Sequence, residues 1–300
     1  MVRVSRFENP ATLTPRFAQM AKSKISIVKY LNAVPLAWGI LEGPQREVFD
    51  SVLSTPAECA DQLAQGGFDI GLIPSIEFQR IKGCRIVPGP AVAATHRVRS
   101  VILVSVVPLW KVKTVACDSG SRTSVALARI IFNEFYHTRP DFRPAEPNIT
   151  NMLAQSDAAL LIGDNALKFM ETHERPNIEL QKPLVRLGSE PVQVFDLAER
   201  WRFLTGLPFV FAFWAVREGF QDGHVVDVLK QSRDFGLANI PTIAAKYSEQ
   251  LQIKKEFVQE YLERNVHYYM DPTCLEALEL FYKKAAHVGA LTSVRDLQFI

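Results

Sequence analysis

The chain has 300 residues, 48% of them hydrophobic and 22% charged, which is typical of a soluble globular protein with one large domain or two lobes. The formal net charge is +2, but the first 24 residues carry five basic side chains and one acidic one, so the remainder is at about −2. No basic face is therefore expected, which argues against nucleic acid as a partner.

The spacing of cysteine and histidine predicts neither a metal site nor a redox centre. The four cysteines form no C-x-x-C pair, and the six histidines never stand at metal-ligand spacing. Four separated cysteines in a chain of this length are typical of reduced, buried thiols in a cytoplasmic protein. Residues 1–23 lack the apolar run of a signal peptide, and no stretch approaches the roughly 18 apolar residues of a membrane span. We therefore expect a cytoplasmic protein with no membrane partner and treat 1–23 as an N-terminal extension.

Residues 24–38 contain the first expected strand and the first helix. Ile25, Ile27 and Val28 predict a short strand, whereas Asn32 followed by Pro35 predicts the start of a helix. Ligands bind at such junctions in open α/β sheets, because the backbone N–H groups there have no partner. Asn32 could simply cap the helix, which contributes about 1 kcal/mol. Alternatively, its amide points into the crevice and holds a ligand hydroxyl or carboxylate.

Two further strands follow, each ending at a helix. Residues 47–53 predict the second strand, and Thr55 to Glu58 form a capping box for a helix that ends near Gly66. Residues 68–73 predict the third strand, which ends at a junction carrying Ser75 and Glu77. Short apolar strands that alternate with helices predict βαβ units and a largely parallel sheet.

A second strand-and-helix series follows a long β-branched strand at 100–107. The expected elements are a strand at 113–117, a helix at 121–136, a proline-rich connection at 140–147, a strand at 158–162, a helix at 196–205 capped by Asp196, a buried strand at 208–216, and helices near 225–237, 242–248, 254–263 and 273–288.

This order predicts a two-lobed, periplasmic-binding-protein-like (type II) α/β fold, in which each lobe is a mixed, mainly parallel sheet flanked by helices. We expect lobe one at 24–106 plus 217–300, lobe two at 107–207, and hinge strands near 100–107 and 208–216. A ligand would bind in the cleft between the lobes and be enclosed by hinge closure.

Two junctions of the second lobe carry polar groups that would face this cleft. Ser121, Arg122, Thr123 and Ser124 open a helix after Gly120, so a carboxylate would sit well against the positive end of the helix dipole. The ending of a P-loop is missing, which argues against a nucleotide. The simpler interpretation is a serine-capped helix with Arg122 in solvent. Asp164 stands at another junction, where it could cap the helix, accept a substrate hydroxyl or fix Arg122.

Several of these motifs, taken in order, resemble chorismate dehydratase of the futalosine route to menaquinone. Each motif alone is weak, but their order is specific, and the resemblance runs from about Lys24 to the C-terminus. The motifs are Tyr30-Leu31-Asn32 with Pro35, Pro74-Ser75-Ile76-Glu77-Phe78, Ser100 to Ser105, Ser121-Arg122-Thr123-Ser124, Ile162 to Leu167, and Asp196 to Trp214.

The resemblance implies an enzyme that eliminates water from chorismate to give 3-[(1-carboxyvinyl)oxy]benzoate. It implies that Asn32 is central to the reaction, that Ser100 lies in the active site, and that the helix start at 121–124 cradles a carboxylate. Ser75 and Asp164 join the expected substrate-binding residues. The reaction makes the ring aromatic, so we expect no metal and no redox cofactor. Two features depart from the family pattern: the Asp118-Ser-Gly turn, and Arg97 and Arg99 in the loop just before Ser100.

Three other functions compete with this interpretation. A non-catalytic solute-binding protein for a small carboxylate would share the fold, but it would carry an export signal, which residues 1–24 do not show. A ligand-sensing regulatory domain would need a DNA-binding segment that 23 residues cannot hold. Another enzyme of the menaquinone route is disfavoured by the Tyr-Leu-Asn and Ser-Arg-Thr-Ser stretches.

Overall fold

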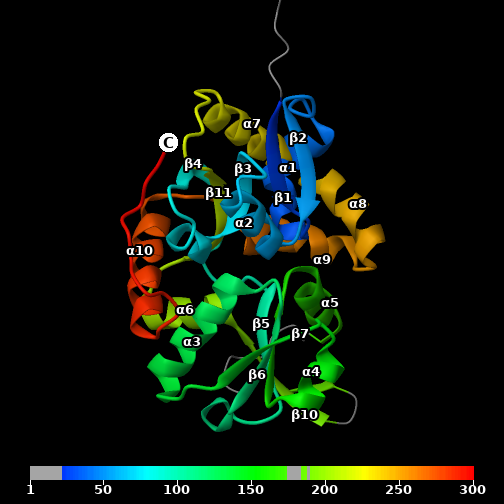
Figure 1. The fold of residues 1–300 in the computed structure, drawn as a ribbon. Coiled ribbons are helices and arrows are strands. Elements are labelled where there is room, and N and C mark those ends of the chain that lie inside the picture. Colours follow the sequence, from blue (N-terminus) through cyan, green and yellow to red (C-terminus); the bar gives the residue numbers. More distant parts are fainter. Residues whose placement is uncertain (1–21, 174–183, 188–189) are drawn as a thin grey trace, which may run out of the picture.

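The computed structural model describes residues 22–173, 184–187 and 190–300, so the expected extension at 1–23 lies almost wholly outside the described residues. Two mixed sheets, each flanked by helices, lie one above the other along the molecule (Figure 1). The predicted two-lobed α/β fold with mixed sheets is confirmed. The expectation that each sheet is mainly parallel is wrong, because each has two parallel and three antiparallel pairings among the strands that the structure describes. Within the described residues, no helix combines the length and the apolarity that crossing a bilayer requires.

The first sheet is assembled from both ends of the chain. Its strand order is β12-β4-β11-β3-β1-β2, with β1 parallel to β2 and β3, and with β11 antiparallel to β3 and β4. The strands are β1 (Ser23–Val28), β2 (Phe49–Ser54), β3 (Ile70–Pro74), β4 (Arg85–Ala94), β11 (Phe209–Val216) and β12 (His267–Tyr269). The helices of this lobe are α1 (Val34–Glu42), α2 (Pro56–Ala64), α7 (Val225–Ala238), α8 (Ile240–Leu251), α9 (Lys255–Glu260) and α10 (Pro272–His287). The predicted capping box of α2 is confirmed, because the Thr55 and Glu58 side chains both bond to the backbone.

The second sheet is built from one continuous stretch, with the order β7-β6-β8-β5-β10-β9. Its strands are β5 (Val101–Ser105), β6 (Thr114–Asp118), β7 (Asp141–Ala145), β8 (Ala158–Ile162), β9 (Leu184–Leu187) and β10 (Glu190–Asp196), and its helices are α3 (Arg122–Tyr136), α4 (Ile149–Gln155), α5 (Gly163–His173) and α6 (Leu197–Thr205).

Two expectations about these segments are wrong. Residues 101–106 were expected in the first lobe, but β5 pairs with β8 and β10 in the second sheet, so the chain changes sheets before Val101. The proline-rich connection at 140–147 contains the edge strand β7, where Pro144 is tolerated because an edge strand has one side without a ladder.

Asp196 ties the two places where the chain crosses between the sheets. Its carboxylate accepts the backbone N–H of Ala198 and Glu199 at 3.0 and 3.1 Å, which confirms the predicted cap of α6. It also accepts the N–H of Val98 and Arg99, at 2.9 and 2.6 Å, in the segment that leads from β4 of the first sheet to β5 of the second. One buried carboxylate therefore holds both crossings together.

Helix α10 packs against both lobes (Figure 1). The ring of Phe281 meets Trp201 of α6 and Phe209 of β11 edge to face, with centroids 6.3 and 5.0 Å away. Lys284 pairs with Glu134 of α3 at 3.0 Å. The C-terminal helix therefore stabilises the arrangement of the two lobes as well as covering the first.

Candidate active site

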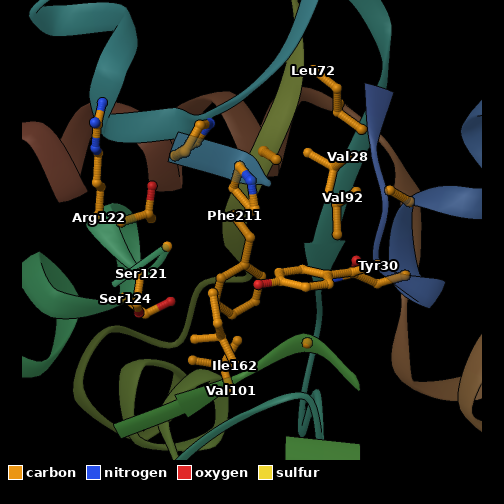
Figure 2. A pocket seen from close by; sticks show the side chains of 18 residues that line it. Val28, Tyr30, Leu72, Val92, Val101, Ser121, Arg122, Ser124, Ile162 and Phe211 are labelled. Atoms are coloured by element: carbon orange, nitrogen blue, oxygen red, sulfur yellow. The ribbon is translucent and has the colours of Figure 1, made fainter. Parts of the chain in front are cut away.

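A cavity of about 510 Å³, partly open to solvent, lies between the two sheets (Figure 2). The carboxyl ends of β1, β3, β6 and β8 meet there, because strands of both lobes run towards the cleft. Its walls are mainly apolar, with polar groups gathered at the start of α3 and in the turn after β1. The lining residues are Val28, Tyr30, Asn32, Ala33, Pro56, Leu72, Pro74, Val92, Val101, Gly120, Ser121, Arg122, Thr123, Ser124, Ile162, Gly163, Phe211 and Ala212.

The start of α3 forms the polar side of this cavity. Ser121 is the N-cap residue, yet its hydroxyl caps nothing and is buried without a hydrogen-bond partner among the described residues. Ser124, only 5% exposed, lies one turn further on. The first N–H groups of a helix have no partner within the helix, and its dipole is positive at this end. Hydroxyls and amides here can bind a carboxylate of a ligand.

Asn32 lies on the other side, in a 3₁₀ turn over Leu31–Ala33. The capping interpretation of Asn32 is wrong: Tyr30 is the N-cap of this turn, Ala33 is the N-cap of α1, and neither helix start has a side-chain cap. The Asn32 amide makes no hydrogen bond to any residue that the structure describes. An amide without a partner at the wall of a cavity can donate to and accept from a ligand.

Tyr30 is a cavity residue that the sequence analysis did not propose. Its hydroxyl reaches the α3 loop and would lie 3.5 Å from a Cβ at Gly120 (Figure 2). Burial, with smaller contributions from Asp118 and Asp164, raises the pKa of the Tyr30 phenol well above its ordinary value. The group therefore stays protonated and can act as a hydrogen-bond donor. Its place in the turn, directly before Leu31 and Asn32, is the signal that could have identified it.

Three of the expected substrate-binding or catalytic residues do not line the cavity. The Ser75 hydroxyl is buried and donates to the carbonyl of Val210 at 2.8 Å. The Ser100 hydroxyl is also fully buried, beside the phenol of Tyr261. The carboxylate of Asp164 accepts the N–H of Leu31 at 2.9 Å. Ser75 and Asp164 thus make bonds within the protein, and the roles given to all three in substrate binding remain predictions.

Arg122 lines the cavity, but its guanidinium is held by two acids of the first lobe. It makes a bidentate pair with Asp61 of α2, at 2.8 and 2.9 Å, and approaches Glu77 at 3.3 Å. The alternative that Asp164 fixes Arg122 is therefore wrong, and Arg122 does not extend into solvent as a simple capped helix would allow. Because α3 belongs to the second lobe, this ion pair joins the lobes across the rim of the cavity.

Thr123 adds a second link across the cleft. Its hydroxyl oxygen accepts the backbone N–H of Ile76 at 3.3 Å and lies 3.5 Å from the hydroxyl of Ser75. Both partners belong to the short 3₁₀ helix Ser75–Gln79 of the first lobe. Through these contacts and the Arg122 ion pairs, the two lobes touch each other around the cavity.

Asp118, in the turn that departs from the family pattern, lies beside the start of α3. One oxygen accepts the N–H of Gly120 at 3.1 Å, and the other is buried without a partner among the described residues. Burial raises the pKa of this carboxyl. The group fixes the turn that presents Ser121, and it lines a second, outer hollow rather than the cavity itself.

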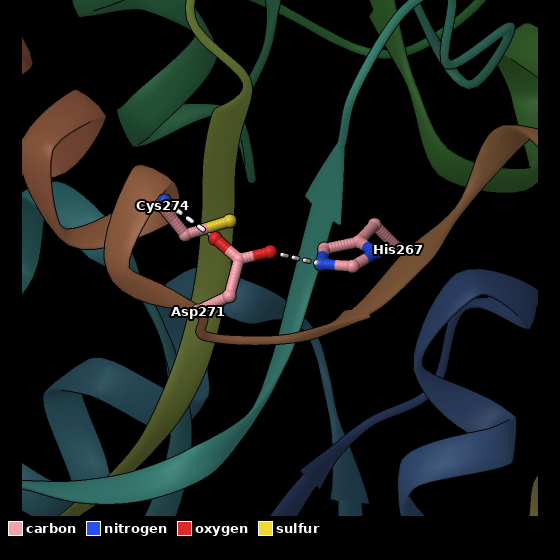
Figure 3. A group of neighbouring side chains, drawn as sticks. All are labelled: His267, Asp271 and Cys274. Atoms are coloured by element: carbon pink, nitrogen blue, oxygen red, sulfur yellow. Dashed lines mark hydrogen bonds and ion pairs between the residues drawn. The ribbon is translucent and has the colours of Figure 1, made fainter.

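A histidine, a carboxylate and a thiol meet at the start of α10, which the spacing analysis missed (Figure 3). Asp271 caps α10 by accepting the N–H of Cys274 at 2.9 Å and the hydroxyl of Thr273 at 2.7 Å, and its other oxygen pairs with His267 at 3.0 Å. Burial alone would raise the pKa of Asp271, but these hydrogen bonds outweigh the effect of burial and lower the pKa to about 2. The contacts are those of a charged helix cap, and none of the four side chains lines the cavity.

The sequence places the chain in a known family. The model of a family described as menaquinone biosynthesis matches residues 23–287. The chain belongs to this family. Among curated relatives, the chorismate dehydratase of Thermus thermophilus is 31% identical over 243 residues, which cover 79% of this chain and 86% of the relative. The menaquinone biosynthesis family match therefore includes both sheets and the whole lining of the cavity.

Solved structures with little sequence identity to this chain have a similar fold. Protein AF1704 from Archaeoglobus fulgidus has a TM-score of 0.69 at 15% identity and covers 91% of this chain and 100% of its own. The periplasmic aliphatic sulphonate binding protein of Escherichia coli has a TM-score of 0.61 at 13% identity, covering 93% of each chain. At this identity the likeness concerns the fold alone, and it agrees with the predicted periplasmic-binding-protein-like architecture.

Proposed function

We propose that this member of the menaquinone biosynthesis family is a chorismate dehydratase, a carbon–oxygen lyase that forms 3-[(1-carboxyvinyl)oxy]benzoate. One observation carries the proposal. In a chain 31% identical to a chorismate dehydratase, an apolar cavity has the Asn32 amide on one side and the start of α3 on the other. The apolar walls suit a six-membered ring, and the α3 start suits its carboxylates.

The reaction balances without an added reactant. The C4–O bond of chorismate breaks, C3 loses its proton, and the electron pair of the C3–H bond completes an aromatic ring while water leaves. Aromatisation supplies the driving force, so the protein can act mainly by positioning the ring and by hydrogen bonds that strengthen as charge shifts. The proton at C3 can be taken by the enolpyruvyl carboxylate of the substrate itself, which the proposal therefore requires to be held near C3.

We assign roles to residues on this basis. Asn32 hydrogen-bonds the reacting ring substituents, since its amide is otherwise uncommitted. The hydroxyls of Ser121 and Ser124, with the first amides of α3, hold a carboxylate. Ser100 receives no contact with substrate in this proposal, because its hydroxyl is fully buried and does not line the cavity. Its place in the active site stays a prediction from the family resemblance.

The test is incubation of the purified protein with chorismate, followed by chromatography and ultraviolet detection of a new benzoate product. Wild-type protein should consume chorismate, and Asn32→Ala should lower kcat by about 100-fold, the scale expected for a group that acts mainly in the transition state. Asn151→Ala, an exposed asparagine on α4, is the matched control and should behave as wild type.

Two outcomes would contradict the proposal. Tight binding of chorismate without product would favour the non-catalytic solute-binding alternative. An Asn32→Ala variant within a few-fold of wild type would leave dehydration in place but remove the assigned role of Asn32.

A further inference from the structure

The turn that carries Asn32 is docked onto the opposite lobe. The backbone N–H of Leu31 donates to the carboxylate of Asp164, at the start of α5, with 2.9 Å between nitrogen and oxygen. The ring of Tyr30 lies directly on Gly163, where an added Cβ would be 2.7 Å from two ring carbons. Two consecutive residues of the first lobe therefore contact two consecutive residues of the second.

Few bonds other than this one fix the turn. The N–H of Ala33 donates to the carbonyl of Tyr30 at 3.0 Å, which closes the 3₁₀ turn on itself. Neither helix start in this turn has a side-chain cap. The bond to Asp164 is thus the anchor closest in sequence to Asn32, and it comes from the other side of the cleft.

Gly163 is suited to this docking by its own backbone. Its φ of +57° lies in the left-handed region, and its N–H donates to the carbonyl of Ser100 at 2.8 Å. The absence of a side chain lets the Tyr30 ring approach, and the next residue of α5, Asp164, accepts the N–H of Leu31. The contact joins the two lobes, because its two halves belong to different sheets, so any opening of the cleft here would break it.

We propose that Asp164 is a positioning residue: by holding the Leu31 amide across the cleft, it aligns the Asn32 amide with the substrate only in the closed form. This inference rests on the proposed dehydratase function. Asp164 does not line the cavity, so it acts through Leu31 rather than on the substrate. Coupling alignment to closure keeps the open protein inactive until the ring is enclosed.

Several charged or titratable groups face Asp164. Lys168 lies on α5 itself and Lys29 directly follows β1. The negative charge of Asp164 also contributes to the raised pKa of three phenols, those of Tyr30, Tyr247 on α8 and Tyr261. Burial raises the pKa of Asp164 to about 6, and the bond from Leu31 and the two lysines oppose the rise. Above pH 6 the ionised carboxylate is the stronger acceptor, so alignment of Asn32 should improve as the pH rises through about 6.

The test compares Asp164→Asn with Asp164→Ala. Asn keeps an oxygen that accepts the Leu31 N–H, so kcat at pH 8 should stay within about threefold of wild type, and the acidic limb of the kcat profile near pH 6 should disappear. Ala removes the acceptor, so kcat should fall about 10- to 100-fold with a smaller change in KM, as expected for misplacement of a reacting group. Asp157→Ala, which removes a carboxylate that accepts the N–H of Lys113 and Thr114 away from the cavity, should leave kcat unchanged.

Backbone amide exchange separates this inference from the proposed function. The Leu31 amide should be protected in wild type and in Asp164→Asn, and should exchange at least 10-fold faster in Asp164→Ala. This holds whether or not chorismate is the substrate. Unchanged exchange of Leu31 in Asp164→Ala would overturn the inference, as would equal loss of kcat in both variants. A wild-type protein that shows the exchange pattern but no turnover would instead overturn the dehydratase proposal.

Discussion

Replacing Asp61 by Asn should weaken substrate binding, because the bidentate pair between Asp61 and Arg122 joins the lobes at the rim of the cavity. Asp61 is half exposed and the Arg122 side chain is 29% exposed, so water and salt screen the pair. Exposed pairs contribute up to about 1 kcal/mol, and the two-point geometry favours the upper end of that range. A loss of 1 kcal/mol from the closed form corresponds to a rise of about fivefold in KM.

The sign of the change distinguishes two roles for Arg122. If the guanidinium binds a substrate carboxylate, as the sequence analysis expected, removing Asp61 frees it and KM should fall. If it acts as a link between lobes, KM should rise, and wild-type KM should rise towards the variant at high salt, where the pair is screened.

The assay is steady-state chorismate turnover at low and at high ionic strength. Glu42→Gln is the matched control, because Glu42 and Lys246 form a pair of similar exposure at 2.6 Å within the first lobe. A lower KM for Asp61→Asn, or an equal rise in the Glu42 control, would refute the reasoning.

Three other changes have definite expected outcomes. Gly163→Ala should displace the Tyr30 ring and reduce activity. The control is Gly206→Ala, because Gly206 has a similar positive φ but a Cβ added there would have no atom within 4 Å, so its loss of activity should be much smaller. Turnover and melting temperature of the two variants provide the comparison. Burial raises the pKa of Asp164 to about 6, so the folded protein binds this proton more tightly than the unfolded chain does. The unfolding free energy should therefore fall as the pH rises from about 4 to about 6. Asp164→Asn should remove that fall, on the order of 3 kcal/mol, in urea titrations across this pH range. Asp196→Ala leaves four backbone N–H groups without their acceptor and should lower the urea-derived unfolding free energy by about 3 kcal/mol or more.

The positions of strand-to-helix junctions could be predicted from the sequence, because they depend on local pattern. The capping box at Thr55, the cap at Asp196 and the start of α3 after Ser121 all follow from residues within one turn. The carboxyl ends of parallel strands gather at one edge of each sheet, and the predicted cleft sets these two edges face to face, so the meeting of Asn32 with Ser121 and Ser124 at one cavity followed as well.

The direction of each junction side chain could not be predicted in this way. Ser75 and Asp164 stand at the same kind of junction as Asn32, yet their side chains bond to backbone groups of Val210 and Leu31 and do not line the cavity. The partners of Arg122, Asp61 and Glu77, lie 61 and 45 positions earlier, and no local pattern links them. The sheet to which β5 belongs was equally hidden, because a strand buried on both faces has the same composition in either sheet.

The unequal make-up of the two sheets has a consequence for how the polypeptide reaches its native state. The sheet of residues 101–196 is complete within one stretch, whereas strands β3 and β4 each lack a neighbour until β11 is synthesised more than one hundred residues later. Contacts between distant parts of a chain form slowly, and open strand edges invite association with other chains. We therefore expect the lobe of residues 101–196 to fold first on the ribosome. Chaperones should bind mainly to β3 and β4, whose edges stay unpaired until β11 is synthesised.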